Sequence, residues 1–239
     1  MNFFRRTFLA VLLVSLDVGT ALAVTASKSY TNPKLSSGQT SVTRVCMTPP
    51  EAQLDKVGMK GVEGMSKESE IWSAQLQAVV ETELKDLGVA ITSTGMSNSD
   101  LESNDDLRQA MLQIQEKYKS VATQMERKAK DIKKSRYTLG DEVALLPCSA
   151  DSDSLAFVEG EGRVLTGGKK AFGMLIGGES SSRGTLRITF VDAKSGDVLA
   201  YALFLNNGKF EDDPQSAYGK KLGKELKKIG IGPHEGKKK

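Results

Sequence analysis

Residues 186–204 read LRITFVDAKSGDVLAYALF. Apolar Leu186, Ile188 and Phe190 alternate with their neighbours, which is the pattern of a strand with one buried face. The polar segment 192–197, which contains a glycine, separates this strand from the second apolar run that follows it. This arrangement predicts a β-hairpin. Because side chains alternate along a strand, we expect one face of both strands to lie against a core.

Three segments carry apolar residues at the three- and four-residue steps of a helix. The first spans 70–87 and ends at Gly88, and the last begins at an N-cap, Asp213, followed by a proline, and ends near Ile229. Between them, a capping box at 99–102 begins a long helix that extends to about Arg136. Its near-heptad stripe favours a helix lying on a sheet, and a helix hairpin or a dimer seam remain as alternatives. The stripe consists of Leu107, Met111, Ile114, Tyr118, Val121, Met125 and Ile132.

The remaining apolar runs predict further strands. One covers 41–47 and ends at Thr48-Pro49-Pro50, and residues 51–69 are expected to be mostly loop. Short strands are expected at 89–92 and 142–146, and two irregular strands between 156 and 176. The order of these elements predicts an α/β (α+β) fold, a mixed β-sheet with the long helix, the C-terminal hairpin and the terminal helix packed on it.

The N-terminus resembles a cleavable secretory signal. Arg5-Arg6 precede an apolar run, 7–16, and Ala21-Leu22-Ala23 supply the small residues that a signal peptidase needs. The apolar run is about half the length needed to span a bilayer of ~30 Å. Cleavage is therefore expected after Ala23, and no cysteine follows it to carry a lipid. The protein should be exported to the periplasm or the extracellular space, soluble or peripheral.

Cleavage leaves 216 residues, because 23 of the 239 are removed. Residues 24–40 are polar and are expected to form a flexible leader, followed by a single α/β domain at 41–230. The segment 231–239 is expected to be a disordered basic tail. The formal charge falls from +3 to about +2 with the signal. This near balance, together with export, argues against a nucleic-acid partner.

The mature chain contains two cysteines, Cys46 and Cys148. An even pair in an oxidising compartment predicts a disulfide, although two buried thiols would also fit the sequence. Each cysteine ends an apolar run. If the two runs were neighbouring parallel strands, the thiols would lie side by side.

The sequence carries no recognisable catalytic motif. Its only histidine, His234, lies in the tail, so neither a hydrolase triad nor a zinc site is evident. The glycine–lysine segment 167–170 departs from a phosphate-binding loop, and the segment beginning at Asp151 departs from a calcium loop. No cofactor and no metal are therefore expected. A hydrolase without a recognisable motif remains an alternative.

Three short motifs are similar to those of a superfamily of bacterial envelope accessory domains. That superfamily includes the curli secretion lipoprotein, the lipoprotein activators of peptidoglycan synthases and the amino-terminal domain of the Tol propeller protein. The motifs are Met47-Thr48-Pro49-Pro50, the segment 140–146 as the entry to a central strand, and 191–199 at the hairpin. The resemblance implies a non-catalytic domain that binds a partner protein. It transfers no functional residue, and the anchoring cysteine of those lipoproteins is missing.

Export and the missing catalytic motif favour a non-catalytic protein of the cell envelope, which binds an envelope protein or supports envelope assembly. The sequence does not identify the partner. A second hypothesis is peripheral contact with an anionic membrane through the basic face of the last helix. That face consists of Lys220, Lys221, Lys224, Lys227 and Lys228.

Overall fold

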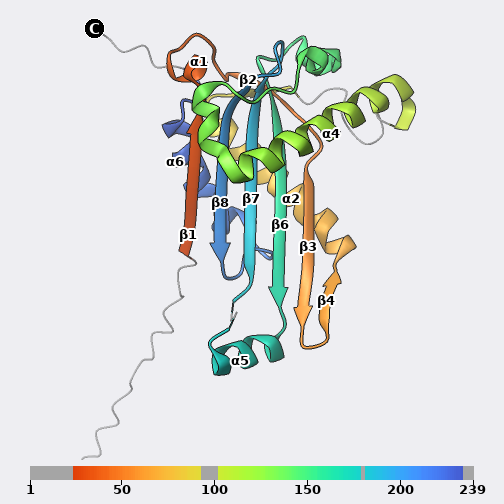
Figure 1. Cartoon of the computed structure of the whole chain (residues 1–239), viewed down its shortest axis with the longest axis vertical. Helices are drawn as coiled ribbons and strands as arrows, with labels where there is room; N and C mark the ends of the chain where they lie inside the picture. The colour runs from red at the N-terminus through yellow and green to blue at the C-terminus, as the bar shows by residue number, and fades with distance from the viewer. Residues whose placement is uncertain (1–23, 93–101, 179–180, 234–239) are drawn as a thin grey trace, which may run out of the picture.

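The computed structural model describes residues 24–92, 102–178 and 181–233. It contains a mixed eight-stranded sheet with the order β1-β8-β7-β6-β2-β5, in which β3 pairs with β6 and β4 with β3. Helices cover both faces of the sheet, α4 in front and α2 and α6 behind (Figure 1). The mixed-sheet architecture expected from the sequence is confirmed. The elements are β1 (Val24–Thr31), α1 (Pro33–Ser36), β2 (Arg44–Met47), β3 (Glu51–Gly58), β4 (Gly61–Gly64), α2 (Ser66–Asp86), β5 (Ala90–Ile91), α4 (Asp105–Lys128), the short helices η1 (Ala129–Lys134), η2 (Asp141–Leu145) and η3 (Pro147–Ser149), β6 (Ser154–Leu165), α5 (Gly167–Ile176), β7 (Arg183–Asp192), β8 (Val198–Asn207), the π-helical turn η4 (Gln215–Gly219) and α6 (Lys220–Lys228).

The expected hairpin is confirmed as β7 and β8. Its antiparallel register places Phe190 opposite Ala200 and Leu186 opposite Phe204. The Asp192 carboxylate closes the turn, because it accepts hydrogen bonds from the backbone N–H groups of residues 194 and 195. The turn also places Gly196 at φ 70°, in the left-handed region that favours glycine.

The rear face of the sheet forms the larger hydrophobic core. Side chains of β6, β7 and β8 pack there against α2 and α6. Trp72 of α2 lies directly on the β6 backbone, so a Cβ atom at Gly160 would collide with it. Gly184 of β7 is held in the same way under Phe210 and Tyr218. These glycines bring large aromatic side chains close to the sheet.

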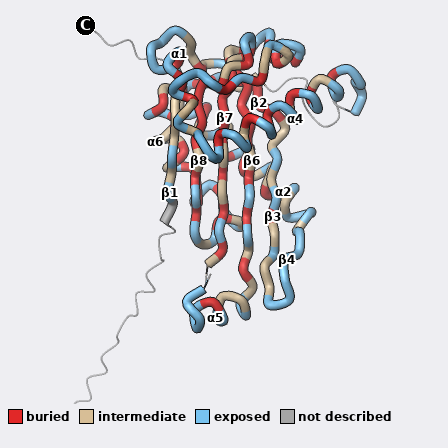
Figure 2. Tube along the Cα trace, viewed as in Figure 1, coloured by how far each residue is buried: buried red, intermediate tan, exposed pale blue. Residues whose placement is uncertain are grey.

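The front face is covered only in its upper half, by α4 and the short helices that follow it. The apolar stripe of α4 is buried in one cluster with Leu155, Phe157 and Val191 of the sheet. A helix lying on a sheet is thus the correct interpretation, and the stripe is occupied within the chain. Below α4, exposed and buried residues alternate along the strands (Figure 2). The lower half of the front face is therefore open.

Residues 24–40, expected to form a flexible leader, are instead ordered, and this prediction was wrong. Residues 24–31 form β1, which pairs with β8 from Val24 opposite Asn207 to Thr31 opposite Ala200. Asn32, which is fully buried, ends the strand by donating its side-chain amide to the Val198 carbonyl oxygen. The backbone partner of this polar strand lies far away in the sequence, so composition alone did not reveal it.

Three other expectations are corrected. Much of the expected loop 51–69 forms β3 and β4, because the chain rejoins β6 after the two prolines. Residues 142–146 are not a strand: 142–145 belong to the helical turn η2, and the Ser149 hydroxyl of η3 donates to the Val143 carbonyl oxygen. The second irregular strand after 165 is the helix α5, capped by Thr166, whose hydroxyl accepts from the Lys169 N–H.

Three expectations concern residues that lie wholly or partly outside the described part of the chain. The signal 1–23 lies entirely outside it, as do residues 234–239 of the basic tail and residues 99–101 of the capping box. The described helix α4 is instead capped by Asn104, whose side chain accepts a hydrogen bond from the Leu107 N–H. The C-terminal helical segment behaves as expected at its start, where the Asp213 carboxylate accepts from the Ser216 N–H.

Candidate binding surface

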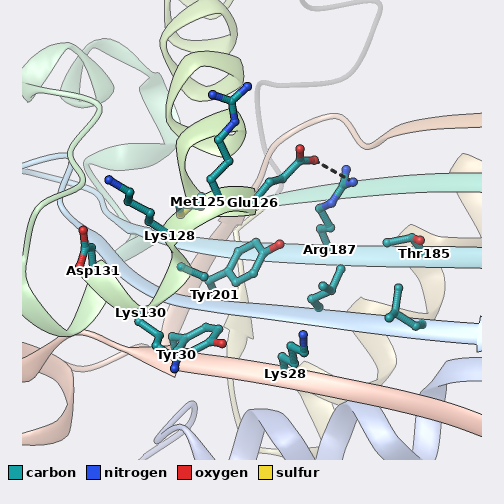
Figure 3. A pocket seen from close by; sticks show the side chains of 14 residues that line it. Lys28, Tyr30, Met125, Glu126, Lys128, Lys130, Asp131, Thr185, Arg187 and Tyr201 are labelled. Carbon is teal, nitrogen blue, oxygen red and sulfur yellow. Dashed lines mark ion pairs between the residues drawn. The ribbon is translucent and has the colours of Figure 1, made fainter.

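A groove of about 630 Å³ lies on the open half of the front face, between the end of α4 and the strands β1, β8 and β7. The strands supply every second side chain, as the pleat of a sheet requires. Figure 3 shows Tyr201 and Arg187 on its floor, with Tyr30 and Lys28 from β1 along one side. The end of α4 forms the opposite rim, and the start of η1 brings Lys130 next to Tyr30. The complete lining is Lys28, Tyr30, Met125, Glu126, Arg127, Lys128, Ala129, Lys130, Asp131, Thr185, Arg187, Tyr201, Leu203 and Leu205.

Arg187 is held by two carboxylates from different elements. Its guanidinium pairs with Glu126 of α4 at 2.9 Å (Figure 3) and with Glu161 of β6 at 2.8 Å, and its side chain is 13% exposed. Burial by itself would lower the pKa of Arg187, but the hydrogen bond and charge of Glu161 outweigh it and raise the pKa. The guanidinium is therefore a permanently charged group with a fixed position on the floor of the groove.

A buried polar cluster lies beside Arg187, under α4. The Tyr118 hydroxyl donates a hydrogen bond to Glu159 at 2.8 Å and lies 3.1 Å from the Thr189 hydroxyl, while its ring stacks on Phe157. Burial raises the pKa of Glu159, although the hydrogen bond from Tyr118 opposes this shift. The polar atoms of the cluster are hydrogen-bonded to one another, so the cluster anchors α4 to the sheet.

The groove also carries tyrosines and exposed apolar surface. Burial raises the pKa of the Tyr201 hydroxyl to about 12, so this group stays protonated at physiological pH. Tyr30 of β1 is half-buried beside Tyr201, and Leu205, on the same strand as Tyr201, is 38% exposed. Tyrosine rings that offer both an apolar body and a hydroxyl are typical of binding surfaces.

The lining has an excess of positive charge, with five cationic side chains against two carboxylates. Both carboxylates are already engaged, Glu126 with Arg187 and Asp131 with two basic residues outside the groove. Within the described part of the chain, the other four cations of the lining form no ion pair of their own. Acidic groups are therefore the ligands that this surface attracts. These four cations are Lys28, Arg127, Lys128 and Lys130.

The arrangement offers little for acid–base catalysis. A general base needs an unengaged group near a substrate, with a pKa close to the working pH. Glu126 and Glu161 face the Arg187 guanidinium, and Glu159 points at Tyr118. Among residues 24–92, 102–178 and 181–233, no group of three or more His, Cys, Asp or Glu side chains could hold a metal ion.

The predicted disulfide between Cys46 and Cys148 is present, with Cα atoms 5.8 Å apart. The expectation that both cysteines end neighbouring parallel strands was wrong for one of them. Cys46 lies on a strand, β2, but Cys148 lies on the helical turn η3, which packs over the end of that strand. The bond therefore ties the front layer to the sheet, and it takes no part in the groove.

The five lysines of the last helix lie on α6, behind the sheet and away from the groove (Figure 1). Four are exposed and Lys221 is half-buried. The apolar residues Leu222 and Leu226 of this helix are fully buried in the rear core. Whether the basic face contacts a membrane stays a prediction. In the parts of the chain that the structure describes, no helix has both the length and the apolar character needed to cross a bilayer.

Sequence reasoning missed the groove residues. Lys28 and Tyr30 were assigned to the flexible leader, and Arg187 was treated only as the polar partner in an alternating strand. The alternation in the hairpin gave one indication of a binding surface, since its outward positions hold arginine and tyrosine. The sequence did not show that β1 and the end of α4 lie beside these positions.

No protein-family model matches the chain, and no curated protein matches it. One similar solved structure is the PelC dodecamer from Paraburkholderia phytofirmans, at 11% identity and a TM-score of 0.41, covering 88% of this chain and all of that one. A variant of the same dodecamer in another crystal form matches at 7% identity and a TM-score of 0.40, covering 87% of this chain and 98% of that one.

Proposed function

We propose that this protein is an exported, non-catalytic component of the bacterial cell envelope that binds a partner protein in the groove on the open half of its sheet. The observation that carries the proposal is the groove itself, a sheet surface that α4 leaves uncovered. It presents a fixed arginine, two tyrosines and an excess of positive charge. The partner segment that fits it is acidic, with apolar or aromatic residues between its carboxylates.

Two features support export to the envelope. The N-terminal 23 residues resemble a secretory signal, and a buried disulfide is typical of oxidising compartments and rare in the cytosol. The resemblance of the hairpin motif 191–199 to the envelope accessory domains supports the same compartment. The motif at 140–146 adds nothing to this support, because that segment is a helical turn and not a strand.

The chemistry of the groove supports binding to an acidic chain. Lys28 of β1, Lys128 at the end of α4 and Lys130 of η1 all line the groove, so an acidic segment in it would meet positive charge from three elements. Leu203 and Leu205 extend the floor with apolar surface. Charged rims of this kind chiefly raise the rate and the specificity of association, while buried aromatic and apolar contacts supply most of the affinity.

The test is a pull-down from envelope extracts, in which the mature wild-type protein is compared with two charge-reversal variants. Lys28→Glu/Lys130→Glu alters the groove, and Lys224→Glu/Lys227→Glu makes the same change of charge on α6. We expect one captured protein, identified by mass spectrometry, to be lost with the groove variant and kept with the α6 variant. Its binding should also weaken as salt is raised, since exposed charges are screened. Equal capture by both variants would show that the groove is not the binding surface.

A further inference from the structure

The lower end of the molecule carries a cluster of exposed apolar side chains, called here the apolar tip. It consists of the turn between β3 and β4 with the start of β4, together with the helix α5, and these parts lie next to each other at the lower end of the sheet (Figure 1). Of the ten large apolar side chains that are exposed in the described part of the chain, six belong to this tip. They are Met59, Val62, Phe172, Met174, Leu175 and Ile176, with exposures of 62%, 66%, 41%, 69%, 85% and 64%.

The two parts of the tip are joined. The Thr166 N–H, just before α5, donates to the Val57 carbonyl oxygen at 3.1 Å. The side chain of Met59 lies beside Gly168 in the first turn of the helix. The apolar residues of the hairpin and of the helix therefore form one patch. Concentrated apolar surface of this kind marks an interaction site rather than ordinary surface variation.

The distribution of apolar residues around α5 indicates what kind of environment the helix enters. Successive helical residues are rotated by about 100°, so Phe172, Met174, Leu175 and Ile176 point to nearly all sides of the helix axis. In its second half, only Gly173 is buried. A helix that docks on a protein needs one apolar stripe, whereas a helix that is apolar all round is surrounded by an apolar medium.

The charges beside the tip fit the surface of an anionic bilayer. Lys169 and Lys170 lie in the first turn of α5, which contains no acidic residue, and the exposed Lys60 lies in the hairpin turn. Lysines next to an inserted apolar segment can reach headgroups with their amines, and each strengthens the attraction to an anionic surface.

We propose that the apolar tip inserts into the headgroup and acyl boundary of an anionic membrane, and so holds the protein peripherally on that surface. This assigns membrane contact to α5 and the β3–β4 turn, and not to the lysine face of α6. The two surfaces differ in one respect that matters for insertion. The apolar residues of α6 are buried in the core, and those of α5 are exposed. The inference does not depend on the groove.

The test uses protein recovered from a bacterial host that exports the full chain, so that processing is the same for every variant. Co-sedimentation with vesicles of phosphatidylglycerol and phosphatidylcholine should detect binding, which should fall with phosphatidylcholine alone. Leu175→Asp should lower the vesicle partition coefficient about tenfold or more, because a leucine that would enter the bilayer is replaced by a charge. The matched control is Leu145→Asp, which alters a leucine that is 64% exposed on η2. This control should bind as the wild type does.

Two further measurements locate the contact. Lys169→Glu/Lys170→Glu should weaken binding more than Lys224→Glu/Lys227→Glu on α6. In Leu175→Trp, the fluorescence of the introduced tryptophan should shift to the blue when vesicles are added, and brominated lipids should quench it. The fluorescence of the buried Trp72 should stay constant. Unchanged emission, or wild-type vesicle binding by Leu175→Asp, would overturn the proposal. It would also be overturned if Leu175→Asp abolished self-association in lipid-free ultracentrifugation and left vesicle binding intact, because the tip would then bind a second copy.

Discussion

Breaking the disulfide should remove a large part of the stability of the fold. Cys46 and Cys148 are 102 residues apart in the sequence, so the bond closes almost half of the chain into one loop. In the chain-entropy model a loop of this length lowers the entropy of the unfolded state by about 16 cal/mol/K, which is ~4.7 kcal/mol at 25 °C. Small domains are stable by only ~5–15 kcal/mol, so the reduced protein should be marginal.

Urea denaturation of the oxidised and the reduced protein measures this difference. The free energy of unfolding should fall by ~4.7 kcal/mol on reduction. The dependence on urea should become steeper, because an unfolded chain without the cross-link exposes more surface. The variant Cys46→Ala/Cys148→Ala is the control, since reductant should leave its unfolding unchanged. A loss below ~2 kcal/mol, with the bond verified by peptide mapping under non-reducing conditions, would refute the reasoning.

Three further predictions concern the core, the buried carboxylate and the signal. Phe190→Ala should lower the free energy of unfolding by ~3–5 kcal/mol in thermal or urea denaturation, because the side chain is fully buried. Lys194→Ala in the exposed turn should lower it by less than ~0.5 kcal/mol. A neutral Phe190→Ala would contradict the register of the hairpin. Burial raises the pKa of Glu159, so its contribution to stability is present at low pH and is lost as pH rises through that raised value. Glu159→Gln should therefore gain in melting temperature relative to wild type as pH rises above 4.5, the ordinary pKa of a glutamate, and a constant difference would show that the carboxylate is not desolvated. Intact-mass analysis of protein recovered from the envelope should give a chain that begins after Ala23, and a mass that includes Met1 would contradict export by cleavage.

The elements that could be predicted from the sequence are those whose signals are local. Alternation around Phe190 and the stripe beginning at Leu107 are periodic patterns, and each depends on residues a few positions apart. The apolar run at 142–146 has no period. Such a run cannot distinguish a strand from a compact helical turn, and here the turn packs Val143 into the front core.

The elements that were missed depend on distant partners. The strand β1 is polar because one of its faces borders the groove and the other borders α6, where the Ser29 hydroxyl donates to Glu225. Its strand conformation comes from backbone pairing with β8, which no local pattern reveals. The groove was missed for the same reason, since Lys28 and Arg187 come together only in the folded sheet, on either side of Leu203. The disulfide was predicted because cysteine pairing follows from compartment and number, with little dependence on secondary structure.

The pairing of β1 with β8 also constrains when the protein can fold. The described chain opens with a strand whose hydrogen-bonding partner reaches Asn207, so nearly the whole polypeptide must be available before that edge of the sheet can form. A chain that leaves the ribosome or a translocation pore N-terminus first therefore carries β1 unpaired through most of the passage. Pairing of this edge is therefore a late step in folding, and under the proposed export it would follow the passage of the chain across the membrane.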